Sequence, residues 1–285
     1  RKESSAASDV YKRQIILLSS SDMLASYFPA NSWEISSPEQ QQVRSDNVNA
    51  LINLAFLDDS TQAVVVVKNG KIISEKYAEG YDKNSHGTSW SMAKSYYAAL
   101  IGISIDKGEI SSLDDKVGKY LDYFNDERSE ITIRDLLDMS SGLDFPKDEH
   151  ETMFFQEDHL KYAMNVGVEK SAGLKFEYNN VNSMLLGDIL IAATGKKADT
   201  LLKERILDHI GVKDYKLWKD ENGNVLTYCC VDMSARDYSK IGLLFSRNGN
   251  WDGKQLISKK YVDETFQVVW DITPERFTEL KRGYS

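Results

Sequence analysis

Residues 88–110 read TSWSMAKSYYAALIGISIDKGEI, and the interpretation of the whole chain starts from this stretch. Its small and apolar residues predict a helix from about Ser91 to Lys107, and Gly108 suits the position just past a helix end. Residues three apart lie on one face of a helix. The spacing therefore places the side chain of Lys94 beside the hydroxyl of Ser91.

This Ser-x-x-Lys spacing suits nucleophilic catalysis. A serine hydroxyl is a weak nucleophile until a base removes its proton, and a partly buried lysine can be that base because desolvation disfavours its charge. Ser91 would lie in the first helical turn, where unpaired backbone N–H groups and the helix dipole favour a developing oxyanion. The pattern makes Ser91 a candidate nucleophile and Lys94 a candidate general base.

The same spacing occurs again within the predicted helix, at Ser104 and Lys107. There the pair lies in the last turns, where Lys107 suits the negative end of the dipole and Ser104 gains no oxyanion site. Ser-x-x-Lys alone is thus a weak signal in a chain rich in serine and lysine. We interpret Ser104 and Lys107 as structural residues.

Aromatic residues flank the candidate nucleophile, with Trp90 before it and Tyr96 and Tyr97 after it. Large aromatic side chains contribute most often to a core. We expect core packing for most of these three, with one of them available to line a pocket.

Upstream of this stretch the chain predicts a helix and then a hairpin. Pro38 is typical of a first helical position, and apolar residues follow it at helical spacing. Two β-rich runs, Ala63–Lys68 and Lys71–Ala78, then flank Asn69-Gly70. Asn-Gly between two such runs is a strong signal for a two-residue hairpin turn.

Downstream, helical signals dominate residues 109–250. Capping spacings and glycine stops mark these helices at Thr132–Asp135, Ser234–Asp237, Gly195 and Gly211. The order of helix, hairpin, helix and a long helical stretch predicts an α+β fold, with an antiparallel sheet flanked by helices. Because two strands are marginal alone and no convincing long strand follows before Tyr261, the predicted sheet is incomplete.

The charge balance excludes one class of partner. The chain carries 35 lysines and arginines against 44 acidic residues, and binding to phosphates needs the opposite surplus, so we expect no nucleic-acid partner. The four histidines lack metal-ligand spacing, so no metal site is predicted. Cys229 and Cys230 are neighbours, which rarely reach disulfide geometry, and we interpret them as buried small hydrophobic residues.

The two ends of the chain differ from its middle. Residues 1–14 are polar and patternless, and we interpret them as a non-native leader, followed by an unassigned segment at residues 15–37. The apolar run Ile15–Leu18 is too short for a transmembrane helix or a signal-peptide core. Residues 38–285 form the predicted main domain, which we expect to be truncated at its C-terminus.

Four segments resemble, in order, the β-lactamase-related serine hydrolases, a family that includes class C β-lactamases, DD-peptidases and esterases. They cover the family's nucleophile region, the segment after it, its second motif and the segment that follows: residues 88–121, 131–145, 173–196 and 229–258. The segments SMAKS, at residues 91–95, and SARD, at residues 234–237, are most similar to the 6-aminohexanoate-dimer hydrolase branch. The resemblance implies the fold shared by β-lactamases and penicillin-binding proteins.

The resemblance also assigns site residues. The family's serine nucleophile corresponds to Ser91 and its lysine to Lys94, while its Tyr-x-Asn motif corresponds to Tyr178 and Asn180. By resemblance, Tyr178 shares the proton transfers with Lys94, and Asn180 binds a substrate amide. Tyr-x-Asn also occurs at residues 123–125, before an acidic run, where we interpret it as structural.

One family feature has no counterpart in this chain. The third motif, Lys/His-x-Gly on a strand that lines the site, does not occur before the chain ends, and Gly195–Lys197 lies in the wrong place and order. In the family that strand supplies part of the cleft and the second oxyanion N–H. We therefore expect the 285-residue chain by itself to be inactive or poorly stable.

The resemblance implies a serine hydrolase that cleaves a small amide, ester or peptide through an acyl-enzyme on Ser91. It implies no metal and no organic cofactor. The alternative is a non-catalytic penicillin-binding-like sensor or binding module. The choice among β-lactam, D-peptide, ester and linear amide stays open, as does the oligomeric state. Many members act outside the cytoplasm, which favours a periplasmic or extracellular location.

Overall fold

The computed structural model describes residues 27–29, 32–145, 150–272 and 280–282, and the predicted leader at residues 1–14 lies outside them. Its helices are α2 (Ser45–Ala55), α3 (Ala93–Asp106), α4 (Ile133–Leu137), α5 (His150–Phe154), α6 (His159–Asn165), α7 (Asn180–Thr194), α8 (Ala198–Leu202), α9 (Ala235–Ser246) and α10 (Lys259–Thr265). Single turns are η1 (Glu39–Gln41), η2 (Trp90–Met92), η3 (Val117–Lys119), η4 (Glu127–Glu130) and the π-helical η6 (Lys203–Leu207). The strands are β1 (Ala63–Lys68), β2 (Lys71–Tyr77), β3 (His86–Thr88), β4 (Lys216–Leu217), β5 (Val231–Ser234), β6 (Asn250–Trp251), β7 (Lys254–Gln255), β8 (Trp270–Ile272) and β9 (Leu280–Arg282).

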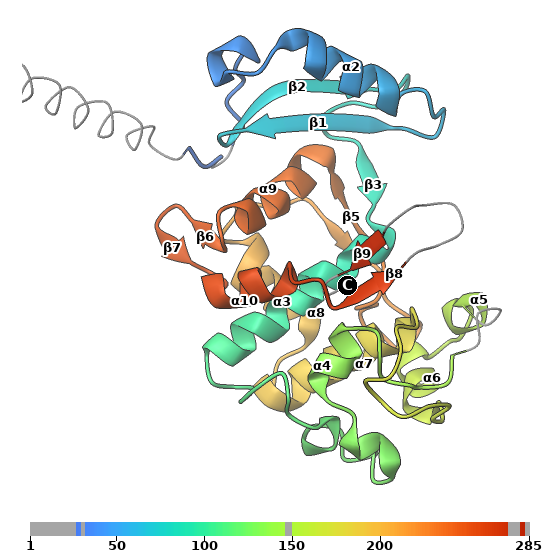
Figure 1. Ribbon diagram of the computed structural model, residues 1–285. Coiled ribbons are helices and arrows are strands. Elements are labelled where there is room, and N and C mark those ends of the chain that lie inside the picture. The colour runs from blue at the N-terminus through green and yellow to red at the C-terminus, as the bar shows by residue number, and fades with distance from the viewer. Residues whose placement is uncertain (1–26, 30–31, 146–149, 273–279, 283–285) are drawn as a thin grey trace, which may run out of the picture.

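Figure 1 shows these elements in three stacked parts. At the top, α2 covers the β1–β2 hairpin, and α9 packs beneath that hairpin against β1. α3 crosses the middle of the molecule, and α4, α6 and α7 form a helical part below it. This combination of small antiparallel sheets with helices confirms the predicted α+β class.

The hairpin forms as its turn residues predict. β1 and β2 pair antiparallel along their length, with a register shift between Val66 and Val67. Asn69 and Gly70 make the turn with φ angles of +52° and +81°. A type I′ turn requires positive φ at both central positions, which is why Asn-Gly favours it.

The helix before the hairpin begins later than predicted. The helical spacing after Pro38 suggested one continuous helix, but Gln42 has a φ angle of +59° and interrupts it after η1. α2 then runs to Ala55 as expected. Its apolar face buries Val48 and Ile52 against Ile73 of β2, so tertiary packing rather than the proline decides where the helix lies.

A second sheet, with strand order β3-β5-β4, was not predicted. Its strands have two to four residues, which is too short to show an alternating pattern. The β8–β9 pair and the short β6–β7 pair, which encloses a turn at Asp252-Gly253, were not predicted either. β3 matters most for function because it leads directly into η2 and α3.

α3 lies in the centre of the main core and packs against α7. Nearly all of its residues are buried, including Lys94. Gly102 permits a close contact with α10, because a Cβ atom there would lie 2.3 Å from Cδ1 of Tyr261. The hydroxyl of Tyr261 donates to the main-chain carbonyl of Ala98 at 2.7 Å, which fixes α10 against α3.

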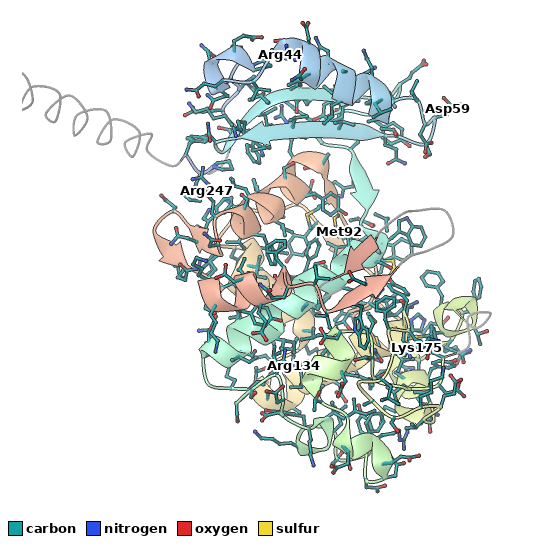
Figure 2. The ribbon with its side chains drawn as sticks, in the orientation of Figure 1. Arg44, Asp59, Met92, Arg134, Lys175 and Arg247 are labelled. Atoms are coloured by element: carbon teal, nitrogen blue, oxygen red, sulfur yellow. A yellow bond between two sulfur atoms is a disulfide. The ribbon has the colours of Figure 1, made fainter. Side chains whose placement is uncertain are left out.

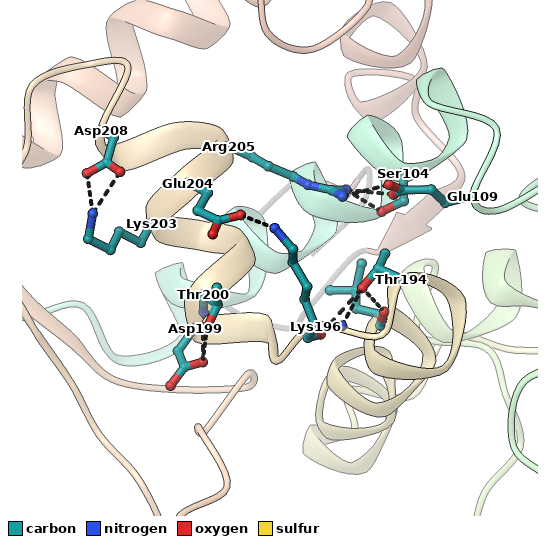
Figure 3. Close-up of polar contacts among 11 residues, drawn as sticks. Ser104, Glu109, Thr194, Lys196, Asp199, Thr200, Lys203, Glu204, Arg205 and Asp208 are labelled. Carbon is teal, nitrogen blue, oxygen red and sulfur yellow. Dashed lines mark hydrogen bonds and ion pairs between the residues drawn. The ribbon is translucent and has the colours of Figure 1, made fainter.

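The far end of α3 is held by Arg205, whose contacts with Glu109 and Ser104 are drawn in Figure 3. Arg205 of η6 donates to the carboxylate of Glu109 at 2.7 and 2.8 Å and to Oγ of Ser104 at 2.9 Å. Ser104 is fully buried in this contact. The interpretation of Ser104 as a structural residue is therefore confirmed.

The predicted helix boundaries hold best where a side-chain cap defines them. Thr132 and Asp135 form the expected capping box of α4, and Ser234 caps α9. Gly195 ends α7 with a φ angle of +71°. Residues 198–211 differ from the prediction of one helix, because α8 passes into the π-helical turn η6.

Candidate active site

Ser91 lies in η2, which runs directly into α3. The regular α-helix begins at Ala93, two residues later than predicted. Just before it, the main-chain N–H of Ser89 donates to the carbonyl of Val231 at 2.8 Å, and Oγ of Ser89 accepts from the N–H of Val231 at 2.9 Å. These bonds to β5 hold the backbone just before Ser91, which is itself exposed. Met92, the next residue, is labelled in Figure 2 and marks the position of Ser91.

Trp90 has an unusual conformation beside Ser91. Its φ angle is +45°, its carbonyl accepts from the N–H of Cys230 at 3.2 Å, and it is 62% exposed. Tyr96 and Tyr97 are buried in the core. Most of the three flanking aromatic residues thus pack in the core, as expected, and Trp90 is the one that does not.

Lys94 lies one turn after Ser91 and is only 1% exposed. Its Nζ donates to Oγ of Ser91 at 3.0 Å and to the main-chain carbonyl of Tyr228 at 2.7 Å. Nζ also lies 4.8 and 5.7 Å from the ring centroids of Tyr178 and Tyr228. Burial lowers the pKa of Lys94 to about 7, because removal from water disfavours the charged form.

Tyr178 reaches Ser91 from the segment before α7. Its hydroxyl donates to Oγ of Ser91 at 2.6 Å. The neighbouring Asn179 caps α7 by accepting from the N–H of Val181 at 2.8 Å, and its Nδ2 donates to the carbonyl of Leu143 at 3.1 Å. These bonds fix the backbone beside Tyr178. The three residues predicted to be catalytic therefore meet at one oxygen atom.

Asn180, the predicted substrate-binding residue, begins α7. Its Oδ1 is buried and has no hydrogen-bond partner among the described residues. A buried polar atom left without a partner costs about 1–3 kcal/mol, so such atoms often serve a ligand. Oδ1 of Asn180 thus has an unused capacity to accept a hydrogen bond.

Three residues that support Lys94 were not predicted. Tyr228 accepts from Lys94 through its main-chain carbonyl, and its hydroxyl lies 2.9 Å from Nδ1 of His159. The main-chain N–H of His159 donates to Oδ2 of Asp220 at 3.0 Å, and burial lowers the pKa of the His159 imidazole. Because every residue carries a main-chain carbonyl, no sequence signal distinguishes Tyr228.

The two neighbouring cysteines, Cys229 and Cys230, are both buried. Cys230 has a φ angle of +71°, which is a left-handed backbone conformation that residues other than glycine rarely adopt. The expectation that both cysteines are buried is therefore confirmed.

In the described ranges, no three His, Cys, Asp or Glu side chains gather as potential metal ligands. Nor does any helix in those ranges have the length and apolar character needed to cross a membrane. The site joins an exposed hydroxyl, a buried amine and a phenol within hydrogen-bond distance. Such a set can remove a proton from Ser91 and deliver one to a nearby group.

Comparison with known proteins places this site in a family context. The family model described as Beta-lactamase matches residues 57–239, which contain all four predicted site residues. The D-aminopeptidase of Brucella anthropi is 28% identical over 178 residues, or 55% of this chain and 33% of that protein. The N-acetylmuramyl-L-alanine amidase of Bacillus subtilis is 25% identical over 181 residues, or 53% of this chain and 41% of that protein. The matched stretch spans less than half of each relative.

Solved structures share the fold. A Bacillus anthracis protein assigned as a 6-aminohexanoate-dimer hydrolase superposes with a TM-score of 0.70 at 21% identity, covering 84% of this chain and 67% of that one. At this identity the likeness shows the fold and nothing more. The architecture predicted from the order of the motifs is confirmed.

Proposed function

The chain belongs to the beta-lactamase family, and on that basis we propose that it is a serine hydrolase that cleaves amide or ester bonds through an acyl-enzyme on Ser91. One observation carries the proposal: Oγ of Ser91 accepts from Nζ of Lys94 at 3.0 Å and from the hydroxyl of Tyr178 at 2.6 Å. The names of the D-aminopeptidase and the amidase among its relatives support amides as the first substrates to test.

Acylation needs a base, and Lys94 supplies it. Because burial lowers its pKa to about 7, a large fraction of Lys94 is neutral near neutral pH. Neutral Nζ takes the hydroxyl proton of Ser91 as Oγ bonds to the substrate carbonyl carbon. Main-chain N–H groups at the start of α3 stabilise the oxyanion. The leaving group takes a proton from Tyr178 or Lys94 as its bond to carbon breaks.

Deacylation uses the same groups in reverse. Lys94 or Tyr178 accepts a proton from a water molecule, whose oxygen bonds to the acyl carbon. The bond from that carbon to Oγ of Ser91 then breaks, and Oγ recovers a proton. Oδ1 of Asn180 accepts a hydrogen bond from the substrate amide in both steps, which satisfies an atom that otherwise has no partner among the described residues.

Replacement of the nucleophile is the first test. Ser91→Ala removes the atom that bonds to the substrate carbonyl carbon in acylation, so we expect kcat for p-nitrophenyl acetate to fall at least ~1000-fold. Ser104→Ala is the matched control, since it alters the second Ser-x-x-Lys pair, and it should keep kcat within about twofold. Unchanged turnover in Ser91→Ala, measured on folded protein, would contradict the proposal. Acylation of Ser91 with no measurable release would favour a sensor over an enzyme.

A further inference from the structure

A row of aromatic rings begins at the residue next to the nucleophile. The ring centroids of Trp90 and Trp218 lie 6.5 Å apart, those of Trp218 and Phe154 6.3 Å, and those of Phe154 and Phe155 6.0 Å. The rings come from η2, from the residue after β4, and from the end of α5. We call these four residues the aromatic row.

The ends of the aromatic row face solvent. Trp90 is 62% exposed and Phe155 is 77% exposed, while Trp218 and Phe154 between them are partly buried. Trp218 and Phe154 pack against the main core, so core packing accounts for the middle of the row. It does not account for the exposed rings of Trp90 and Phe155 at the two ends, and exposed apolar surface of this kind can bind a ligand.

Hydrogen bonds hold the backbone of Trp90 and the ring of Trp218. The carbonyl of Trp90 accepts from the N–H of Cys230, and Nε1 of Trp218 donates to Oδ2 of Asp232 at 2.8 Å. Oδ1 of Asp232 accepts from Oγ1 of Thr88 at 2.6 Å. A positive φ at a residue as bulky as Trp90 is strained, and strain of this kind is concentrated at functional sites.

The aromatic row also adjoins the residues that hold the base. The ring of Phe154 lies 6.2 Å from that of His159, whose Nδ1 contacts the hydroxyl of Tyr228. The carbonyl of Tyr228 in turn accepts from Lys94. Trp90 directly precedes Ser91 in the chain at one end of the row, and these contacts connect Phe154 to the residues that hold Lys94.

Resting on the proposed function, we propose that the aromatic row is a substrate subsite for an uncharged aromatic or large aliphatic group attached close to the scissile amide or ester bond. Rings in tilted and edge-to-face contact attract a further ring beyond the gain from burying its area. The same chemistry serves a group on the acyl side or on the leaving side of the bond. The experiment below distinguishes these two positions.

The test compares kcat/KM within two substrate pairs. On the acyl side the pair is p-nitrophenyl phenylacetate and p-nitrophenyl acetate, and on the leaving side it is the benzylamide and the methylamide of alanine. We expect a preference of about 10–100-fold for the ring in one pair. Trp90→Gly, whose glycine accepts the positive φ, and Trp218→Ala should bring the ratio close to one. Phe266→Ala removes a ring that is 68% exposed outside the row and should leave the ratio unchanged.

A binding measurement on Ser91→Ala protein makes the test independent of turnover. Phenylacetamide should bind saturably, as followed by tryptophan fluorescence, and acetamide should bind at least ~10-fold more weakly. Trp218→Ala should remove this difference. An unchanged ring preference in Trp90→Gly and Trp218→Ala, or equal binding of both amides together with no ring preference in either substrate pair, would overturn the subsite. Selective binding of phenylacetamide without any Ser91-dependent turnover would instead contradict the proposed function and support the subsite.

Discussion

The ammonium group of Lys94 is surrounded by a hydroxyl, a main-chain carbonyl and two aromatic rings. Neutral groups of this kind offset only part of the lost hydration, so burial lowers the pKa of Lys94 to about 7. A lysine in water is almost fully protonated at neutral pH and cannot act as a base. The environment of this one residue therefore decides whether Ser91 can be activated.

The pH dependence of the rate follows from that pKa. Only neutral Lys94 accepts the proton of Ser91, so kcat/KM for p-nitrophenyl acetate should rise about tenfold per pH unit below pH 7. It should level off above about pH 8, where Lys94 is neutral in nearly all molecules. Rates measured from pH 5 to 9, corrected for spontaneous hydrolysis, check this. A flat profile, or one that falls as the pH rises, would contradict it.

The same burial destabilises the folded protein at low pH. Between pH 7 and pH 10.5 the unfolded chain keeps the Lys94 proton and the folded chain releases it. The free-energy cost of burying this lysine therefore decreases as the pH rises through that range. A shift of this size is worth on the order of 5 kcal/mol at pH 6, before the loss of hydrogen bonds is counted. Lys94→Met should therefore raise the Tm more at pH 6 than at pH 10.

Lys240→Met is the matched control for this prediction. Lys240 is also buried, but its Nζ lies 2.9 Å from Oδ1 of Asp237. Removing it leaves that carboxylate without its partner, so Tm should fall. If Lys94→Met lowered the Tm at pH 6 by as much as Lys240→Met, the account of Lys94 would be wrong.

Single residues were predictable where local spacing decides their contact. Ser91 and Lys94 meet because three residues along a helix return to the same face. Tyr178 has no such local reason, and only the order of the motifs singled it out. The outward side chain of Trp90 and the carbonyl of Tyr228 depend on backbone angles and distant contacts that a sequence pattern does not encode.

The starts of two helices form the site at the scale of elements. η2 presents Ser91 at the beginning of α3, and the cap of α7 holds Tyr178. Asn179→Ala removes the bonds to Val181 and Leu143 and should lower the free energy of unfolding by about 1–2 kcal/mol. Because Tyr178 adjoins this cap, we also expect kcat to fall about tenfold.

Ser258→Ala separates stability from catalysis. Ser258 caps α10, away from the site, by accepting from the N–H of Tyr261 at 3.3 Å. Loss of this cap should lower the free energy of unfolding by about 1 kcal/mol and leave kcat unchanged. Chemical denaturation gives the free energy of unfolding of both variants, and steady-state rates give their kcat. An unchanged kcat in Asn179→Ala would show that the cap does not position Tyr178.

Elements with a local signal were predicted well. Asn69-Gly70 defines its hairpin, and Thr132 with Asp135 defines the start of α4, because each needs only neighbouring residues. β3 and β5 pair between residues as far apart as Thr88 and Asp232, and nothing within either short segment indicates the partner. The prediction of where α2 starts was wrong for a related reason, because contacts with the hairpin determine that start.

For the whole molecule, the packing of α3 connects stability to the site. Gly102→Ala would place Cβ 2.3 Å from the Tyr261 ring, so α10 has to move and Tm should fall by several degrees. Gly242→Ala is the matched control in α9, where a Cβ has no atom within 4 Å. It should stabilise the protein by about 0.5–1 kcal/mol, because alanine favours a helix. Thermal unfolding of both variants checks the pair, and equal effects would contradict this packing.

The overall architecture was predictable because the motifs keep the family's order, and α3, which directly follows the turn that contains Ser91, lies in the centre of the core. The central claim is that Ser91 becomes acylated. Mass spectrometry of the protein quenched during turnover of p-nitrophenyl acetate tests it most directly. We predict an added acetyl group on the peptide that contains Ser91, absent from Ser91→Ala and slower to form in Lys94→Met. Acetylation at another residue, or none during Ser91-dependent turnover, would contradict the account.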